Sequence, residues 1–277
     1  MIRSVERFEF KYWITDEVAG RVAELLRPHL VPDAHGGELA QRITSLYLEN
    51  RELEFWHRHV QDAPDRFKLR VRVYGEPPSG PAFFEVKRKV KGVVLKTRAV
   101  VSRAEVAPLV DGSWKKLPRL PPDQDRTLQS FLYKLAVHRA VPRVAVSCVR
   151  DAYKSPDPEE DTRLTIDRDT VYQPCERADF DALDPRGWVA IDTDREHGAN
   201  GHRVMLELKF RDYAPAWMQE LAIKLSLRRT GYSKFVSAVR YETFERYRAG
   251  EHGQAPSRDT FDSDGLPSAP LRPALVP

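Results

Sequence analysis

Apolar and cationic positions alternate strictly between residues 66 and 98. The run RFKLRVRVYG (66–75) is followed, after a Gly- and Pro-rich turn, by AFFEVKRKV (82–90) and then by VVLKTRAV (93–100). Short β-branched runs with a period of two, bounded by Gly and Pro, predict half-buried antiparallel strands. The polar face of these three strands carries a single acid among cations: Lys68, Arg70, Arg72, Glu85, Lys87, Lys89, Lys96 and Arg98.

The same kind of pattern predicts the rest of the fold. Alternation predicts strands at 7–14, 41–50, 143–153, 162–170 and 202–212, with weaker strands around 171–174 and 188–192. Helical spacing predicts helices after Thr15, from Ser102 to Val110, from Thr127 to residue 140, and at 214–227 and 232–247, with a short helix or turn at 51–59. Antiparallel strands with helices between and after them indicate an α+β fold.

The composition of the chain indicates its domain organisation and its cellular compartment. Residues 249–277 are rich in Pro, Gly, Ser and Asp, which predicts a disordered tail after one folded domain at 1–248. A net charge of +4 excludes a polybasic nucleic-acid coat, so the 45 Lys and Arg matter through their positions. The chain has two cysteines, a charged N-terminus instead of a signal peptide, and no apolar run of membrane-spanning length. We therefore expect a cytoplasmic protein.

The cationic strand faces allow two arrangements. In the first, an open sheet covers a helical layer and its charged face lies in water, which is usual for antiparallel sheets. A solvated face normally mixes charges of both signs, because like charges on neighbouring strands repel each other. In the second arrangement, the sheet closes into a barrel around a tunnel lined by Lys and Arg, and its apolar outer face packs on the helices. Such a tunnel requires a polyanion.

Three strands repeat the same acid–base pair, E-x-K, on one face: Glu9 with Lys11, Glu85 with Lys87, and Glu207 with Lys209. Each pair alone is explained by a cross-strand salt bridge. Carboxylates repeated among cations also suit a hard divalent ion that bridges phosphate oxygens. The repetition favours this second interpretation.

These motifs together resemble the VTC domain. They are, in order, RFEFKYWI, ITSLYLEN, KLRVRVYG, FFEVKRK, VLKTR, VSCVRDAY, TRLTIDRD, MLELKF and GYSKFVSAV, spread over residues 7–245. The VTC domain is the polyphosphate polymerase branch of the triphosphate tunnel metalloenzymes, and the CYTH tri- and polyphosphatases form the other branch. The CYTH signature E-x-E-x-K needs a Glu where this chain has Arg7, so the phosphatase branch fits less well.

The resemblance implies an antiparallel tunnel barrel of about eight strands with flanking helices. It also implies which residues bind phosphate and metal. The positions that resemble phosphate-binding residues of the family are Lys11, Arg70, Arg72, Lys87, Lys96, Arg150, Arg163, Ser233 and Lys234. Of these, Lys87, Arg70, Arg72 and Lys234 are expected to act in catalysis. Glu207 resembles the metal-binding glutamate, with Glu85 and Glu9 as less secure matches, and the expected cofactor is Mn²⁺ or Mg²⁺.

The implied reaction is transfer of the γ-phosphoryl group of a nucleoside triphosphate to a growing polyphosphate chain. An acceptor phosphate is already anionic and needs no general base, whereas water would need a carboxylate such as Glu9 or Glu85. Hydrolysis of triphosphates or polyphosphate therefore stays open as an alternative, as does a module that binds polyphosphate without catalysis. Nucleic acid is not an expected partner, because the basic strands lack exposed aromatic residues for base stacking.

Overall fold

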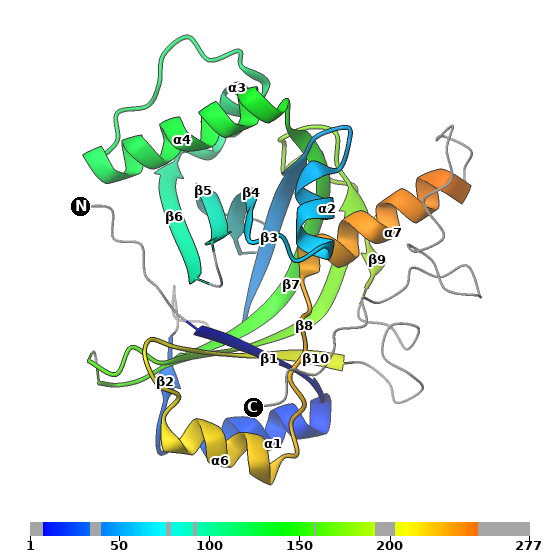
Figure 1. Cartoon of the computed structure of the whole chain (residues 1–277). Helices are drawn as coiled ribbons and strands as arrows, with labels where there is room; N and C mark the ends of the chain where they lie inside the picture. Colours follow the sequence, from blue (N-terminus) through cyan, green and yellow to red (C-terminus); the bar gives the residue numbers. More distant parts are fainter. Residues whose placement is uncertain are drawn as a thin grey trace.

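The computed structural model of the chain describes residues 8–33, 40–75, 79–90, 93–157, 159–191 and 203–248. Within them, ten strands form one antiparallel sheet (Figure 1). Its eight long strands are β1 (Phe8–Thr15), β3 (Ala40–Glu49), β4 (Asp65–Tyr74), β5 (Ser79–Val90), β6 (Val93–Val101), β7 (Val141–Lys154), β8 (Arg163–Pro174) and β10 (Arg203–Phe210). The short strands β2 (Val31–Pro32) and β9 (Val189–Ala190) pair with β7 and β8. The predicted tail at 249–277 lies outside the described residues.

The order of the long strands is β1-β10-β8-β7-β3-β4-β5-β6. The sheet curves into a barrel-like shape that is not closed by hydrogen bonds, because its path ends at β1 and β6 among the residues described. This confirms the predicted α+β class with an antiparallel sheet of about eight strands. The weak strand expected around 171–174 is the end of β8, which continues past residue 170.

The helices are α1 (Asp16–Leu26), α2 (Glu54–Val60), α3 (Val106–Asp111), α4 (Pro122–His138), α6 (Ala216–Lys224) and α7 (Lys234–Arg248), with a 3₁₀ turn at Arg103–Glu105. Thr15 caps α1 as predicted, because its Oγ1 accepts the backbone N–H of Val18 over 3.2 Å. The prediction that Thr127 opens α4 is wrong. The helix begins at Pro122, where the fixed φ of proline suits a first turn, and Thr127 lies within the helix with its hydroxyl bonded to the carbonyl of Asp123.

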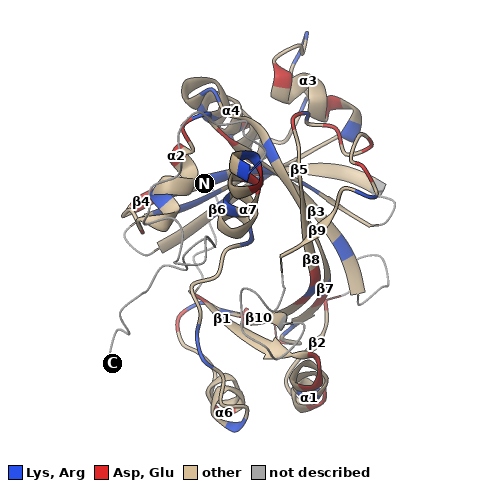
Figure 2. Cartoon of the chain, turned by 90° about the vertical axis from the view of Figure 1, so that its right-hand side faces the viewer, with Lys and Arg blue, Asp and Glu red and all other residues tan. Residues whose placement is uncertain are grey.

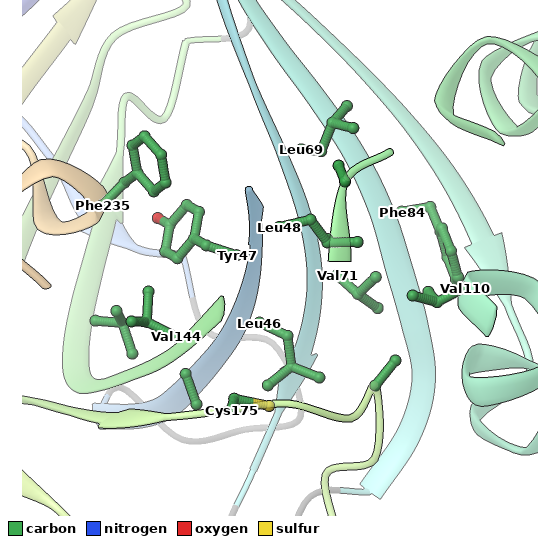
Figure 3. Packing of buried hydrophobic residues seen from close by; sticks show 14 of the residues in the cluster. Leu46, Tyr47, Leu48, Leu69, Val71, Phe84, Val110, Val144, Cys175 and Phe235 are labelled. Carbon is green, nitrogen blue, oxygen red and sulfur yellow. The ribbon is translucent and has the colours of Figure 1, made fainter. Parts of the chain in front are cut away.

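Two apolar cores pack the helices on the sheet, mostly on its outer side, although the start of α7 contacts the inward-facing Tyr47. The larger one packs β3, β4, β5 and β7 against α2, α3, α4 and α7, and Figure 3 shows Leu69, Val71 and Phe84 within it. The smaller one packs β1, β8 and β10 against α1 and α6, which lie side by side below these strands in Figure 1. Burying each large aliphatic or aromatic side chain contributes about 1.5–3 kcal/mol. The apolar strand faces therefore point outward to the helices, and the cationic faces point inward.

The segment between α6 and α7 lies against β1, one end strand of the sheet. Arg229 forms a β-bridge with Tyr12, and the backbone N–H of Thr230 donates to the carbonyl of Lys11 over 2.9 Å. Lys11 Nζ in turn donates to the carbonyl of Tyr232 over 3.0 Å. These contacts place the beginning of α7 at the inner face of the sheet.

None of the described helices combines the length and the apolar character needed to cross a membrane.

Candidate functional site

The inner face of the sheet encloses a cavity of about 360 Å³. Its lining includes four acids, Glu9, Asp33, Asp167 and Glu207, and eleven cations. The cations are Lys11, Lys68, Arg70, Arg72, Lys87, Lys96, Arg98, Arg150, Arg163, Lys209 and Lys234. Figure 2 marks Lys and Arg in blue on strands from both halves of the sheet. The cavity therefore has a large excess of positive charge.

The structure brings the predicted phosphate-binding residues together around this cavity, although they come from distant parts of the sequence. Lys11 comes from β1, Arg70 and Arg72 from β4, Lys87 from β5, Lys96 from β6, Arg150 from β7, Arg163 from β8, and Ser233 with Lys234 from the start of α7. The sheet thus forms the inward-facing cationic wall that the alternation predicts. Arg163 lies at the edge, where its side chain is 44% exposed and is 3.6 Å from Asp33.

Glu85 has a different environment from that of a metal ligand. Its side chain is fully buried and is not part of the cavity lining. It accepts from Arg70 over 2.6 Å, from Lys96 over 2.7 Å and from Arg98 over 2.7 Å. Burial alone raises the pKa of the Glu85 carboxyl, but these cations and Arg72 outweigh burial and hold it well below its usual range. Glu85 therefore holds three cations in place from beneath the cavity.

Asp167 performs the same task on the opposite wall. Arg150 donates to both of its carboxylate oxygens, over 2.5 and 2.7 Å, and Lys234 donates over 2.7 Å. Burial raises the pKa of Asp167, but Arg150 and Lys234 outweigh it and lower the pKa overall. The sequence pattern places Asp167 on the same strand face as Arg163, yet this acid was not among the predicted site residues. No local signal distinguishes it from a solvent-exposed acid.

Lys68 and Arg72 differ from the other nine cations of the cavity. Each of those nine lies within 4.0 Å of a carboxylate oxygen, whereas within the described part of the chain Lys68 and Arg72 bond to hydroxyl groups instead. Lys68 Nζ donates to Ser233 Oγ over 2.6 Å, and Arg72 Nε donates to Ser45 Oγ over 3.0 Å. Lys68 was also not among the predicted site residues, although the alternation places it beside Arg70.

Glu9 and Glu207 are the two predicted metal ligands that face the cavity. Glu9 accepts from Lys87 over 2.7 Å, and Glu207 accepts from Lys209 over 2.7 Å with Lys11 at 3.6 Å. Burial and the mutual repulsion of the two acids raise the pKa of Glu9, but Lys87 and its neighbours lower it overall. Burial likewise raises the pKa of Glu207, and Lys209 and Lys11 hold it well below its usual range. Both acids are therefore charged at neutral pH.

The described residues do not bring three or more His, Cys, Asp or Glu side chains together as a complete metal site. Mg²⁺ is commonly bound by one or two carboxylates, with phosphate oxygens and water completing its shell. Two charged carboxylates in the lining of a cationic cavity fit this donor set. Glu9 and Glu207 therefore suit a divalent ion that arrives with a phosphate ligand.

Comparison with known proteins identifies a family over nearly the whole described chain. The family model described as VTC domain matches residues 6–242. Curated protein sequences give no significant match. Among solved structures, a Bacillus halodurans protein described as a candidate adenylate cyclase is 13% identical, with a TM-score of 0.47, over 84% of this chain and 96% of that one. A Vibrio parahaemolyticus protein with the same description is 10% identical, with a TM-score of 0.41, over 83% and 96%.

Proposed function

Because the chain belongs to the VTC domain family of phosphate-handling tunnel enzymes, we propose that it transfers the γ-phosphoryl group of a nucleoside triphosphate to the end of a polyphosphate chain. The observation that carries the proposal is the charge of the cavity: eleven cations face four acids. Two of these cations, Lys68 and Arg72, bond to hydroxyl groups rather than carboxylates among the residues described. A chain of phosphates supplies the missing negative charge over the length of such a cavity.

The cavity residues would bind and orient the phosphates. Arg72 and Lys68 are available to phosphate oxygens without first leaving a carboxylate. Arg70, Lys96 and Arg98 are held in place by Glu85, and Arg150 and Lys234 are held by Asp167. Fixed cations aimed at developing negative charge lower the barrier of phosphoryl transfer, because catalysis there consists mainly of positioning and charge stabilisation.

The state of the cavity carboxylates favours a phosphate acceptor over water. Glu9, Asp167 and Glu207 have lowered pKa values and are bonded to Lys or Arg, so they are weak bases. A general base works best when its pKa is near the working pH. The terminal oxygen of a phosphate chain is already anionic and does not need one.

A divalent ion, Mn²⁺ or Mg²⁺, would be held by Glu207 and Glu9. When bound, such an ion neutralises the charge of bridged phosphate oxygens. Lys87, Lys209 and Lys11 surround the two carboxylates and keep them ionised, which is the state that a metal ligand requires.

The proposal is tested by incubating the protein with ATP and Mn²⁺ and measuring ADP, orthophosphate and long-chain polyphosphate separately. We expect ADP to accumulate together with polymer. ADP with an equal amount of orthophosphate and no polymer would show a hydrolase, and tight polyphosphate binding without nucleotide turnover would show a binding module.

Two arginine variants provide a matched pair for this assay. Arg72→Met removes a cation of the cavity, and we expect it to abolish most of the polymer formation. Arg88→Met removes a cation from the outer face of β5, where Arg88 is 45% exposed and paired with Asp65. We expect that variant to keep its activity, and equal losses in both variants would contradict a role for the cavity.

A further inference from the structure

Lys68 and Ser233 form a hydrogen-bonded pair at the beginning of α7. Lys68 Nζ donates to Ser233 Oγ over 2.6 Å, and the same oxygen accepts the backbone N–H of Val236 over 3.3 Å. Because the oxygen is the acceptor in both bonds, the O–H hydrogen of Ser233 remains to be donated. The side-chain nitrogen of Lys68 carries two N–H donors as a neutral amine and three as an ammonium, and it uses one of them on Ser233. The pair thus presents hydrogen-bond donors to the cavity.

The charged groups that act most strongly on Lys68 are cations. They are Lys11 on β1, Arg66 and Arg70 on β4, and Lys87 on β5, and the ring of His59 on α2 lies on the same side. Burial and these cations hold the pKa of Lys68 well below its usual range. An amine in this position gives up its proton far more readily than an exposed lysine does.

The neighbouring lysines are not in the same situation. Lys87 is paired with Glu9, and Lys11 lies 3.6 Å from Glu207, so each has a carboxylate beside its side-chain nitrogen. Lys68 has Ser233 in the corresponding place. A phosphate chain against Lys68 would supply the opposite charge that favours the ammonium form.

We propose that Lys68 and Ser233 together bind a linear phosphate chain, and that the amine of Lys68 takes up a proton from solvent as the chain enters the cavity. The proton adds to the lone pair of Nζ, and no other bond changes. The inference rests on the proposed function, since it names a residue of the same cavity and the class of anion that this residue takes. Entry of substrate is then coupled to pH through one side chain.

The experiment is calorimetric titration with inorganic tripolyphosphate, without divalent ions, at about pH 8 in two buffers of different ionisation enthalpy. The difference in measured heat between the buffers gives the number of protons taken up. Lys68→Arg keeps a cation that stays protonated, so it isolates the proton of Lys68. Protons that tripolyphosphate itself exchanges are common to both proteins and cancel in the comparison.

We expect the wild-type protein to take up more protons than Lys68→Arg. We also expect Lys68→Met to lose at least about tenfold in affinity, the effect of one charge-assisted hydrogen bond. Lys224→Met makes the same substitution at an exposed lysine of α6, and its affinity should not change.

Equal proton uptake in the wild-type protein and Lys68→Arg would overturn the inference, as would unchanged affinity in Lys68→Met. Both results leave the proposed function standing, because tripolyphosphate still binds. Failure of the wild-type protein to bind tripolyphosphate at all would count against the proposed function itself.

Discussion

Replacement of Glu85 by Gln tests whether this acid organises the cavity or binds metal. The change keeps the shape of the side chain and removes the charge that holds Arg70, Lys96 and Arg98. Removing one partner of a buried ion pair costs about 3–5 kcal/mol, because the remaining charge is left uncompensated. Since the Glu85 side chain is 0% exposed and serves three cations, we expect a loss near the upper end of that range.

Tripolyphosphate should restore much of this loss. Its negative charge compensates the three cations that Glu85→Gln leaves without a carboxylate, so the variant should bind it more tightly than the wild-type protein does, and each tenfold gain in affinity adds about 1.4 kcal/mol of stabilisation. A ligand at 100 times its Kd stabilises the folded state by about 2.7 kcal/mol. The assay is urea unfolding of both proteins with and without tripolyphosphate, without divalent ions.

A matched control is Glu242→Gln. The Glu242 side chain is also 0% exposed and is paired with two arginines, Arg143 and Arg246, away from the cavity lining. This variant should lose a similar free energy of unfolding without the additional recovery on tripolyphosphate. If Glu85→Gln instead unfolds like the wild-type protein and loses Mn²⁺ binding, the reasoning is refuted and Glu85 is a metal ligand.

Three further predictions concern Asp167, Glu207 and His59. Asp167→Asn should lower kcat by about 100-fold, because Arg150 and Lys234 lose the carboxylate that positions them, and unchanged kcat in the polymer assay would contradict this. Glu207→Gln should remove Mn²⁺-dependent turnover while tripolyphosphate binds as well or better in the absence of metal; weaker metal-free binding would indicate that Glu207 supports the phosphate site itself. Burial and the cation Lys68 lower the pKa of His59 from 6.5 to about 2. As the pH drops below 6.5, His59 becomes protonated in the unfolded chain but stays neutral in the folded protein, so the free energy of unfolding falls. At about 1.4 kcal/mol per pH unit, His59 should cost about 2 kcal/mol between pH 6.5 and 5. Urea unfolding at these two pH values should show this loss for the wild-type protein and a smaller loss for His59→Leu. Equal losses in the two proteins would argue against a neutral buried His59.

Local alternation was sufficient to predict the cationic wall. Lys68, Arg70 and Arg72 share a face because side chains of a strand alternate, and the apolar residues between them pack on the helices. The spacing of apolar residues likewise predicted the positions of α1 and α7 to within about two residues at the ends that it specified. The start of α4 was missed because a proline pair, rather than a polar cap, begins the helix at Pro122.

The different environments of the glutamates in the three E-x-K pairs could not be predicted from the sequence. Glu9, Glu85 and Glu207 have the same local pattern, but the sheet register places Glu85 between Arg70 on one side and Arg98 on the other. Those two strand neighbours enclose Glu85, whereas Glu9 and Glu207 keep a face toward the cavity. The position of the segment before α7 depends on similar distant contacts, such as the hydrogen bond from Thr230 to Lys11.

A crystal structure of the protein with tripolyphosphate tests the role of the cavity most directly. We expect phosphates inside the cavity, with their oxygens about 3 Å from Lys68 Nζ and from the guanidinium of Arg72. We also expect Arg70, Lys87 and Lys96 to face the same ligand. Phosphate bound only on the outer surface, with these side chains directed into bulk solvent on an open sheet, would contradict a phosphate-binding cavity.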